Sequence, residues 1–147
     1  MMSVEPGLVD ANVLVYALDA DAPHHAPSRA LLDAARETPS TLYVTLQVLC
    51  EFYSIVTNAR RVPKPRPPAD ALSAISGLLS FLHVLPIPLH TVGEWLDLLR
   101  RRPISGGDIF DLQIVAAMKA NGVQRIYTFN TEDFEVFPEL AVIIPRA

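Results

Sequence analysis

Three acidic residues occur in stretches of the sequence that are otherwise apolar. Asp10 lies within Gly-Leu-Val-Asp-Ala-Asn-Val-Leu-Val, Glu51 borders the apolar side of a predicted helix, and Asp111 opens Leu-Gln-Ile-Val-Ala-Ala-Met. A buried carboxylate without a partner is unfavourable by several kcal/mol or takes up a proton, so each of the three needs a partner. A site made only of carboxylate oxygens selects Mg²⁺ or Mn²⁺ rather than Zn²⁺. The sequence therefore predicts a site for one of these ions.

Each carboxylate also has an ordinary structural explanation. Asp10 could cap the helix that follows it. Glu51 could pair with an arginine in the segment 60–61, or it could lie on a solvated helix edge. We expect Asp108 to be the N-cap of a helix, which puts Asp111 at the capping-box position, where the helix dipole tolerates negative charge. Singly these explanations stay open, and it is the three residues together that point to a shared site.

The elements that would position these residues alternate between strand and helix. Short apolar strands alternating with helices are typical of an α/β fold with a parallel sheet, in which sites form at the carboxyl ends of the strands. Asp10 ends a strand, Glu51 lies about two turns into the helix after a strand, and Asp111 lies near a helix start, so all three could meet at one sheet edge. The predicted strands are 8–9, 42–44, 84–87, 125–128 and 142–144, and the predicted helices are 13–18, 26–36, 46–58, 70–81, 91–101 and 108–121.

Composition limits the remaining possibilities. The chain has 147 residues, of which 50% are hydrophobic, and we expect residues 1–147 to form a single domain. A net charge of −4 does not favour general coating of nucleic acid. The single cysteine, Cys50, excludes an intramolecular disulfide and a cysteine zinc cluster, and we interpret it as a small core residue. No signal peptide is visible, and the uncharged stretch 71–93 contains two prolines and two histidines, so we expect a cytoplasmic protein without a membrane span.

Four short segments follow one another with a particular spacing across nearly the whole chain. They are Asp10–Asn12, Val48–Phe52, Asp111–Ala117 and Thr128–Phe134. In their order and spacing they resemble the PIN-domain ribonucleases, especially the VapC-type toxins of bacterial and archaeal toxin–antitoxin pairs. The last two segments, about one helix and one strand apart, are the most specific part of this resemblance.

The resemblance implies a three-layer α/β/α fold around a central parallel sheet. It also implies that Asp10, Glu51 and Asp111 hold Mg²⁺ or Mn²⁺ and that RNA is cleaved endonucleolytically by a metal-activated water. As a toxin of a type II pair, such a protein would bind a cognate antitoxin and form a homodimer. The family often has a fourth acid where this chain has Asn130, so the number of ions stays open. The residues expected beside the three acids are Asn12, Asp108, Thr128, Asn130 and Asp133.

Two further features allow more than one interpretation. The basic residues cluster in two segments, which could contact the RNA backbone or could equally form a solvated loop and a helix end. The adjacent His24 and His25 would point to different faces of a helix and are not expected to bind metal. A second functional hypothesis is a catalytically silent PIN-like module that binds RNA or protein, which Asn130 favours. The clustered basic residues are Arg60, Arg61, Lys64 and Arg66 in the first segment, and Arg100, Arg101 and Arg102 in the second.

Overall fold

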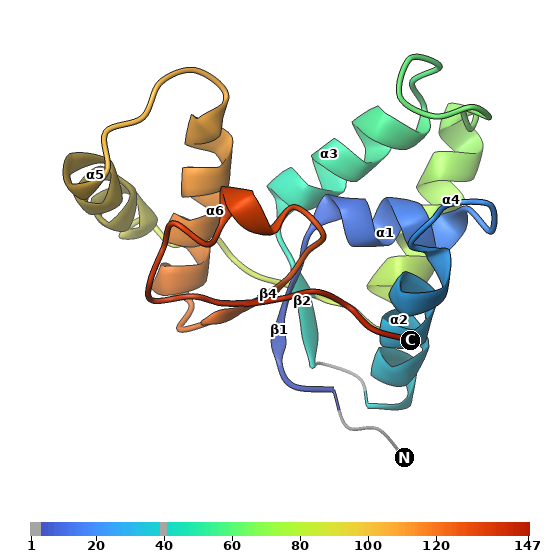
Figure 1. Ribbon diagram of the computed structural model, residues 1–147, viewed down its shortest axis with the longest axis horizontal. Helices are drawn as coiled ribbons and strands as arrows, with labels where there is room; N and C mark the ends of the chain where they lie inside the picture. The colour runs from blue at the N-terminus through green and yellow to red at the C-terminus, as the bar shows by residue number, and fades with distance from the viewer. Residues whose placement is uncertain (1–3, 39–40) are drawn as a thin grey trace.

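The centre of the protein is a parallel five-stranded sheet, seen in a computed structural model that describes residues 4–38 and 41–147. The strands are β1 (Gly7–Val9), β2 (Leu42–Val44), β3 (His83–Val84), β4 (Arg125–Tyr127) and β5 (Ala141–Ile143). Their order across the sheet is β3-β2-β1-β4-β5, and every neighbouring pair is parallel. The carboxyl ends of β1, β2 and β4 therefore meet at one edge, as the sequence predicts (Figure 1).

Helices form the two outer layers. They are α1 (Ala11–Leu18), α2 (His25–Glu37), α3 (Leu46–Val56), α4 (Pro68–Leu79), α5 (Thr91–Arg101) and α6 (Asp108–Ala120), with a short 3-10 helix η1 (Thr131–Asp133). Helices α5 and α6 pack together on one side of the strands, and α1 to α4 gather on the other (Figure 1). The predicted three-layer α/β/α architecture with a central parallel sheet is confirmed.

The middle of the sheet is fully buried, because helices cover both of its faces. Leu8, Leu42 and Ile126 have no exposed surface, which explains why these strands are apolar at successive positions rather than alternating. Gly7 permits the close approach of β1 and β4. A Cβ at this position would lie 2.9 Å from the Tyr127 ring and 3.0 Å from the Arg125 carbonyl oxygen. Packing against β4 therefore favours glycine at the first position of β1, the strand that leads to Asp10.

Several predicted boundaries are shifted. Helix α4 begins at Pro68 rather than Asp70, because proline suits the first position of a helix, where no backbone N–H is needed. Helix α3 ends at Val56, and Thr57 is its C-cap. In α5 the apolar residues Val92 and Leu96 are exposed, whereas Thr91 and Leu98 are buried.

The interpretation of Cys50 as a core residue is wrong, since it is exposed on α3. The core face of this helix is formed instead by Val48, Leu49, Phe52 and Val56. In the described ranges, no helix is both long enough and apolar enough to cross a membrane.

Candidate active site

The sheet edge at the carboxyl ends of β1, β2 and β4 is called the acidic edge below. Asp10 is its most firmly held carboxylate. It follows β1 and is the N-cap of α1, where its Oδ1 accepts a 2.8 Å hydrogen bond from the Ala11 backbone N–H. Its Oδ2 accepts from the Thr128 hydroxyl at 2.8 Å and from the Asn12 amide at 3.2 Å. The side chain is 7% exposed. Asp10 is therefore a helix cap, as the structural alternative proposed, and a hydrogen-bonded group of the sheet edge as well.

Asn12 and Thr128 join β1 to β4 behind this carboxylate. The Asn12 side-chain N–H group also donates to the Thr128 hydroxyl at 3.2 Å, and the side-chain Oδ1 of Asn12 accepts from the Phe129 backbone N–H at 3.2 Å. The Thr128 hydroxyl accepts a further bond from the Asn130 backbone N–H at 3.0 Å. Both residues, predicted to stand beside the acids, thus fix the position of Asp10 and of the loop after β4.

Glu51 is held by a residue that the sequence analysis missed. The Gln47 amide N–H group donates to Glu51 Oε1 at 3.1 Å and to the Phe110 backbone carbonyl at 3.0 Å, which links α3 to α6. The i, i+4 spacing from Gln47 to Glu51 is the signal that could have found it. The alternative pairing of Glu51 with Arg60 or Arg61 is wrong, since the ion pairs of the described residues do not include it.

The start of α6 differs from its prediction. Gly107, not Asp108, is the N-cap, so Asp108 is the first helical residue and is exposed. Asp111 consequently lies one position beyond the capping-box position and has no capping role. It is half-buried and lies in the first turn, where the helix dipole favours negative charge.

Electrostatics show that the acids lie close enough to affect one another. Burial, followed by the charges of the other acids, raises the pKa of Asp111 from its ordinary 3.8 to about 7. Burial also raises the pKa of Asp10, against its hydrogen bonds, and that of Glu51. The acids whose charges raise the pKa of Asp111 are, in decreasing order, Asp133, Asp10, Glu51 and Asp108. The charges of Asp10, Glu51 and Asp133 therefore all act on Asp111 at this edge of the sheet.

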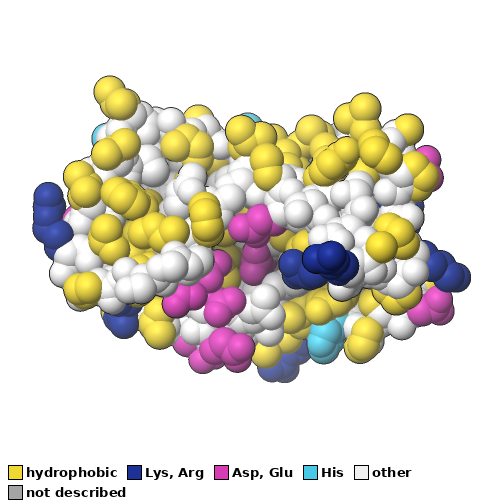
Figure 2. Space-filling model, turned by 90° about the horizontal axis from the view of Figure 1, so that it is seen from above, with side chains coloured by type: hydrophobic (Ala, Val, Ile, Leu, Met, Phe, Trp, Pro, Cys, Tyr) yellow, Lys and Arg dark blue, Asp and Glu magenta, His cyan; other side chains and the backbone are white. Residues whose placement is uncertain are grey.

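The donor chemistry of this edge fits a hard divalent cation. All three predicted ligands offer carboxylate oxygens, and burial, followed by the charge of neighbouring acids, raises their pKa values. Acidic side chains gather in a hollow of this face, with Lys and Arg side chains beside them (Figure 2). As placed, no three His, Cys, Asp or Glu side chains in residues 4–38 and 41–147 lie in an arrangement that could hold a metal ion.

The remaining acidic-edge residues lie where the chain leaves β4. Asn130 is exposed and precedes η1. Its backbone carbonyl accepts a 3.2 Å hydrogen bond from the Asp133 backbone N–H of η1. Asp133 is exposed on η1, and Phe134 after it is fully buried. Asp133 thus occupies the turn before Phe134, and its charge reaches both Asp10 and Asp111.

The two basic clusters are only partly free for a ligand. Arg66 donates to the Leu18 carbonyl at 3.2 Å, at the C-terminus of α1, where a cation is favourable. Arg101 pairs with Asp97 at 2.8 Å, and the Arg102 guanidinium lies 5.6 Å from the centre of the Phe137 ring. Exposed residues of the two clusters without such side-chain contacts among the described residues are Arg60, Arg61, Lys64 and Arg100.

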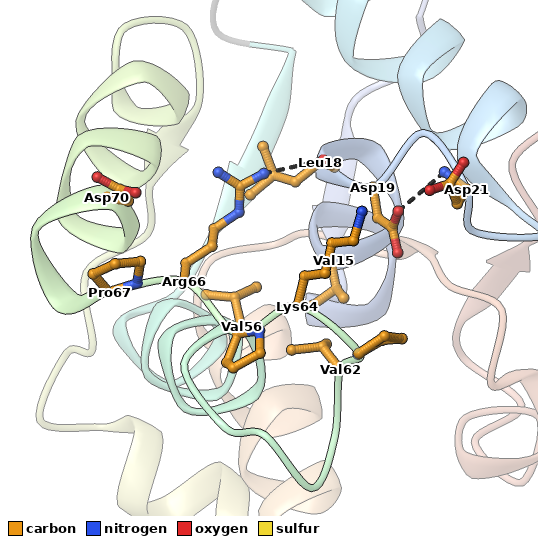
Figure 3. Close-up of a pocket in the computed structure, with 12 residues that line it drawn as sticks. Val15, Leu18, Asp19, Asp21, Val56, Val62, Lys64, Arg66, Pro67 and Asp70 are labelled. Atoms are coloured by element: carbon orange, nitrogen blue, oxygen red, sulfur yellow. Dashed lines mark hydrogen bonds between the residues drawn. The ribbon is translucent and has the colours of Figure 1, made fainter.

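A separate pocket of about 430 Å³ lies under the proline-rich loop (Figure 3). Val15 and Leu18 of α1 form one wall, and Lys64 and Arg66 of the loop form another. Asp10 precedes α1, and the nearest pocket residue of this helix, Val15, lies five positions further on, about 7.5 Å along the helix axis. The pocket is therefore distinct from the candidate active site.

Comparison with protein families identifies this arrangement. The profile of the PIN domain matches residues 7–140, which include all three acids and the loop after β4. The chain belongs to the PIN domain family. The family relationship predicted from the four sequence segments is thus confirmed.

Similar proteins agree with this assignment. Ribonuclease VapC43 of Mycobacterium tuberculosis is 42% identical over 72 residues, which are 49% of this chain and 49% of that protein. The match therefore spans about half the length of this curated relative. In fold, the PIN domain is similar to Mycobacterium tuberculosis VapC20, described as a sarcin-ricin loop cleaving toxin, with a TM-score of 0.69, 16% identity and coverage of 94% and 98% of the two chains. It is also similar to VapBC2 of Rickettsia felis bound to a promoter DNA fragment, with a TM-score of 0.69, 19% identity and coverage of 95% and 98%.

Proposed function

We propose that this PIN domain is a divalent-metal-dependent endoribonuclease and the toxin of a type II toxin–antitoxin pair. The observation that carries the proposal is the position of Asp10, Glu51 and Asp111 at one sheet edge, where burial raises the pKa of each, the charge of Asp10 raises that of Glu51, and the charges of both raise that of Asp111. The ribonuclease names of relatives at 42% identity support the reaction class.

In this proposal Asp10, Glu51 and Asp111 hold the ion. A bound Mg²⁺ or Mn²⁺ supplies an acidified water and offsets negative charge on the phosphate. Asp10 is held in place by Thr128 and Asn12, so it can bind without losing conformational freedom. Glu51, whose pKa is raised by burial, can orient the attacking water and accept its proton. Hydrolysis then forms a bond from the water oxygen to phosphorus and breaks one bond from phosphorus to a bridging oxygen.

Asp133 and Asn130 would complete the site from the loop after β4. The charge of Asp133 acts on both Asp10 and Asp111, whereas Asn130 offers an oxygen without charge. Three strong acidic ligands hold one ion well. A second ion would then arrive mainly with the RNA, whose phosphate supplies further negative charge.

The test is cleavage of fluorescent single-stranded RNA in Mg²⁺, in Mn²⁺ and in excess EDTA. We expect cleavage in at least one ion and none in EDTA, and a loss of at least about 100-fold in Asp10→Asn, because several kcal/mol of transition-state stabilisation rest on the metal. Asp33→Asn is the matched control, because Asp33 is an exposed acid that pairs only with Arg29 and Arg36 on α2. Equal activity in Asp10→Asn and wild type would contradict the proposal.

The catalytically silent module is the second candidate function, and Asn130 is the residue that favours it. The same assay decides between the two. RNA binding without cleavage in either ion, unchanged by Asp10→Asn, is the result expected of a silent module.

The proposed partners are a cognate antitoxin and a second copy of the chain. We place the protein in the cytoplasm, because the proposed substrate is RNA. Large apolar side chains are exposed on α4 and in the segment around the start of α5, which is the kind of surface that a partner covers. Light scattering checks the dimer, and a small upstream reading frame encoding a DNA-binding protein would support the antitoxin. These exposed side chains are Leu72, Leu79, Ile87, Leu89 and Val92.

A further inference from the structure

Three rings from distant parts of the sequence form a cluster beside the acidic edge. The His24 ring stacks on the Phe129 ring, with 4.2 Å between ring centres and 13° between ring planes. The Tyr16 ring meets the edge of both, with its centre 5.3 Å from His24 and 5.6 Å from Phe129. The three residues come from α1, from the turn before α2 and from the loop after β4.

Hydrogen bonds attach this cluster to the candidate active site. Phe129 directly follows Thr128, whose hydroxyl donates to Asp10. The Phe129 backbone N–H donates to Asn12, and the Asn12 amide donates to Asp10. The ring pair is therefore held one residue away from the groups that fix the best-ordered carboxylate.

The outer member of the stack is open to solvent. His24 is exposed, whereas Phe129 and Tyr16 beneath it are half-buried. Although His24 is the N-cap residue of α2, its side chain does not cap the helix. The neighbouring His25 has a structural contact instead, since its Nδ1 lies 2.9 Å from the Tyr16 carbonyl oxygen. One planar face of His24 is thus supported by Phe129, and the other is available to a ligand.

We propose that the His24–Phe129 stack is a base-binding platform, on which an unpaired nucleobase of the RNA lies against the exposed face of His24. The inference rests on the proposed ribonuclease function and adds to it how the substrate is held. Single-stranded nucleic acid commonly binds by stacking bases on aromatic and histidine rings, and such contacts are tolerant of sequence. The platform adjoins the residues that hold Asp10, because the Phe129 N–H donates to Asn12 and the Asn12 amide donates to Asp10. It favours unpaired RNA, because a base inside a duplex has both faces stacked against neighbouring base pairs.

The primary experiment measures binding of a short single-stranded RNA that carries 2-aminopurine, whose fluorescence falls when it stacks. Ca²⁺ replaces Mg²⁺, and a gel confirms that the RNA stays intact. We expect His24→Ala to weaken binding by about 5- to 100-fold and to abolish the fluorescence loss, because one base–aromatic stack is removed. His24→Phe keeps a flat ring and should retain both. An RNA with an abasic site in place of 2-aminopurine should bind wild type and His24→Ala equally.

Two variants guard against misreading. His83→Ala is the matched control, since His83 is also an exposed histidine beside a tyrosine ring but lies on β3, at the far edge of the sheet. Phe129→Leu keeps an apolar support under His24 and removes the flat ring, so it should weaken stacking if His24→Ala proves too unstable to measure. Thermal unfolding of each variant separates loss of binding from loss of fold.

The outcomes separate this inference from the ribonuclease proposal. If wild type cuts RNA, and His24→Ala and Phe129→Leu both bind and quench as wild type does, the platform is overturned and the ribonuclease stands. If wild type cuts no RNA but quenches 2-aminopurine through His24, the platform stands and the ribonuclease is overturned. Absence of both RNA binding and cleavage in wild type overturns both.

Discussion

The two halves of the acidic edge are built in different ways. At the strand half, Asp10 is buried and accepts three hydrogen bonds from Ala11, Asn12 and Thr128. At the helix half, Asp111 is half-buried, and its pKa is raised to about 7 by burial and by neighbouring acids. Hydrogen bonds thus offset part of the effect of burial on the pKa of Asp10, whereas burial and the neighbouring acidic charges act in the same direction on Asp111. The protein preorganises one half of the site and leaves the other half in need of a counter-charge.

Thr128→Val should break the strand half and give the largest effect on stability. It removes a donor to a buried carboxylate and takes away the acceptor of the Asn130 N–H, while the Asn12 amide keeps only its bond to Asp10 among the described residues. A buried group that loses its partner is unfavourable by about 1–3 kcal/mol, so we expect a fall of about 2–3 kcal/mol in the free energy of unfolding, measured in urea. Thr57→Val is the control, because the Thr57 hydroxyl bonds only to the exposed Tyr53 carbonyl. If Thr128→Val and Thr57→Val lower the free energy of unfolding equally, the strand half is not specially stabilised by its hydrogen bonds.

Asp111→Asn should stabilise the helix half, so its effect on the free energy of unfolding should have the opposite sign to that of Thr128→Val. An acid whose pKa is higher in the folded state, here about 7 against an ordinary 3.8, binds its proton more tightly when folded. In the metal-free protein, the contribution of Asp111 to the free energy of unfolding therefore falls as the pH rises from about 4 through 7, and it is lowest above that range. Asp111→Asn should raise the free energy of unfolding at pH 8 by about 1–2 kcal/mol, after allowance for solvent screening, and change it little at pH 4.

The control for this change is metal addition. Mg²⁺ or Mn²⁺ should stabilise wild type, because a ligand that binds only the folded state shifts the unfolding equilibrium, and should stabilise Asp111→Asn much less. A pH-independent effect of Asp111→Asn, with undiminished stabilisation by metal, would show that Asp111 is not part of the crowded half.

Asn130→Asp should add charge between the two halves and strengthen metal binding without RNA by about tenfold, since ligand charge tunes affinity for hard cations. Asp133→Asn should change this affinity little if Asp133 serves mainly the turn before Phe134. Titration calorimetry of both variants measures the difference. Abolished binding in Asp133→Asn, with no gain in Asn130→Asp, would make Asp133 the fourth ligand.

Gln47→Met should give the smallest effect. It keeps the volume of the side chain but removes the hydrogen bonds to Glu51 and to the Phe110 carbonyl. Both bonds are partly exposed, and the Gln47 carbonyl oxygen is buried without a partner among the described residues, so we expect a loss of no more than about 1 kcal/mol. Urea unfolding measures it, and Gln113→Met, which changes an exposed glutamine of α6, is the control. A loss above that of Thr128→Val would reverse the order of the two halves.

Sequence patterns were most informative where local physics decides the structure. Thr45, a residue type that favours the N-cap position, caps α3, and its hydroxyl accepts from the Val48 N–H at 3.2 Å. The limits of α5 agree with their prediction, because Arg101 at its end is followed closely by Pro103. The sequence did not establish which face of α5 is buried. Its outward face also carries apolar residues, so periodicity did not distinguish the packed face from the exposed one.

The three acids were predictable as a set, because charge inside apolar sequence is unfavourable without a partner. Their hydrogen-bond partners were only partly predictable. Thr128 and Asn12 were expected beside the site, but Gln47 was missed, since a glutamine near a helix edge is ordinary in sequence and becomes informative only when it reaches α6. The role of Cys50 was misjudged for a related reason, since a small apolar residue fits either face of a helix.

The sequence by itself determined the alternation of strands and helices, the parallel sheet and the identity of the acids, because these follow from periodicity, capping and the unfavourable burial of charge. Tertiary structure alone decided which residues support them. Asp10 and Thr128 are 118 positions apart, and His24 and Phe129 meet only because β1 and β4 pair side by side. Such contacts depend on strand order and on the path of loops between layers. A local pattern carries no information about either.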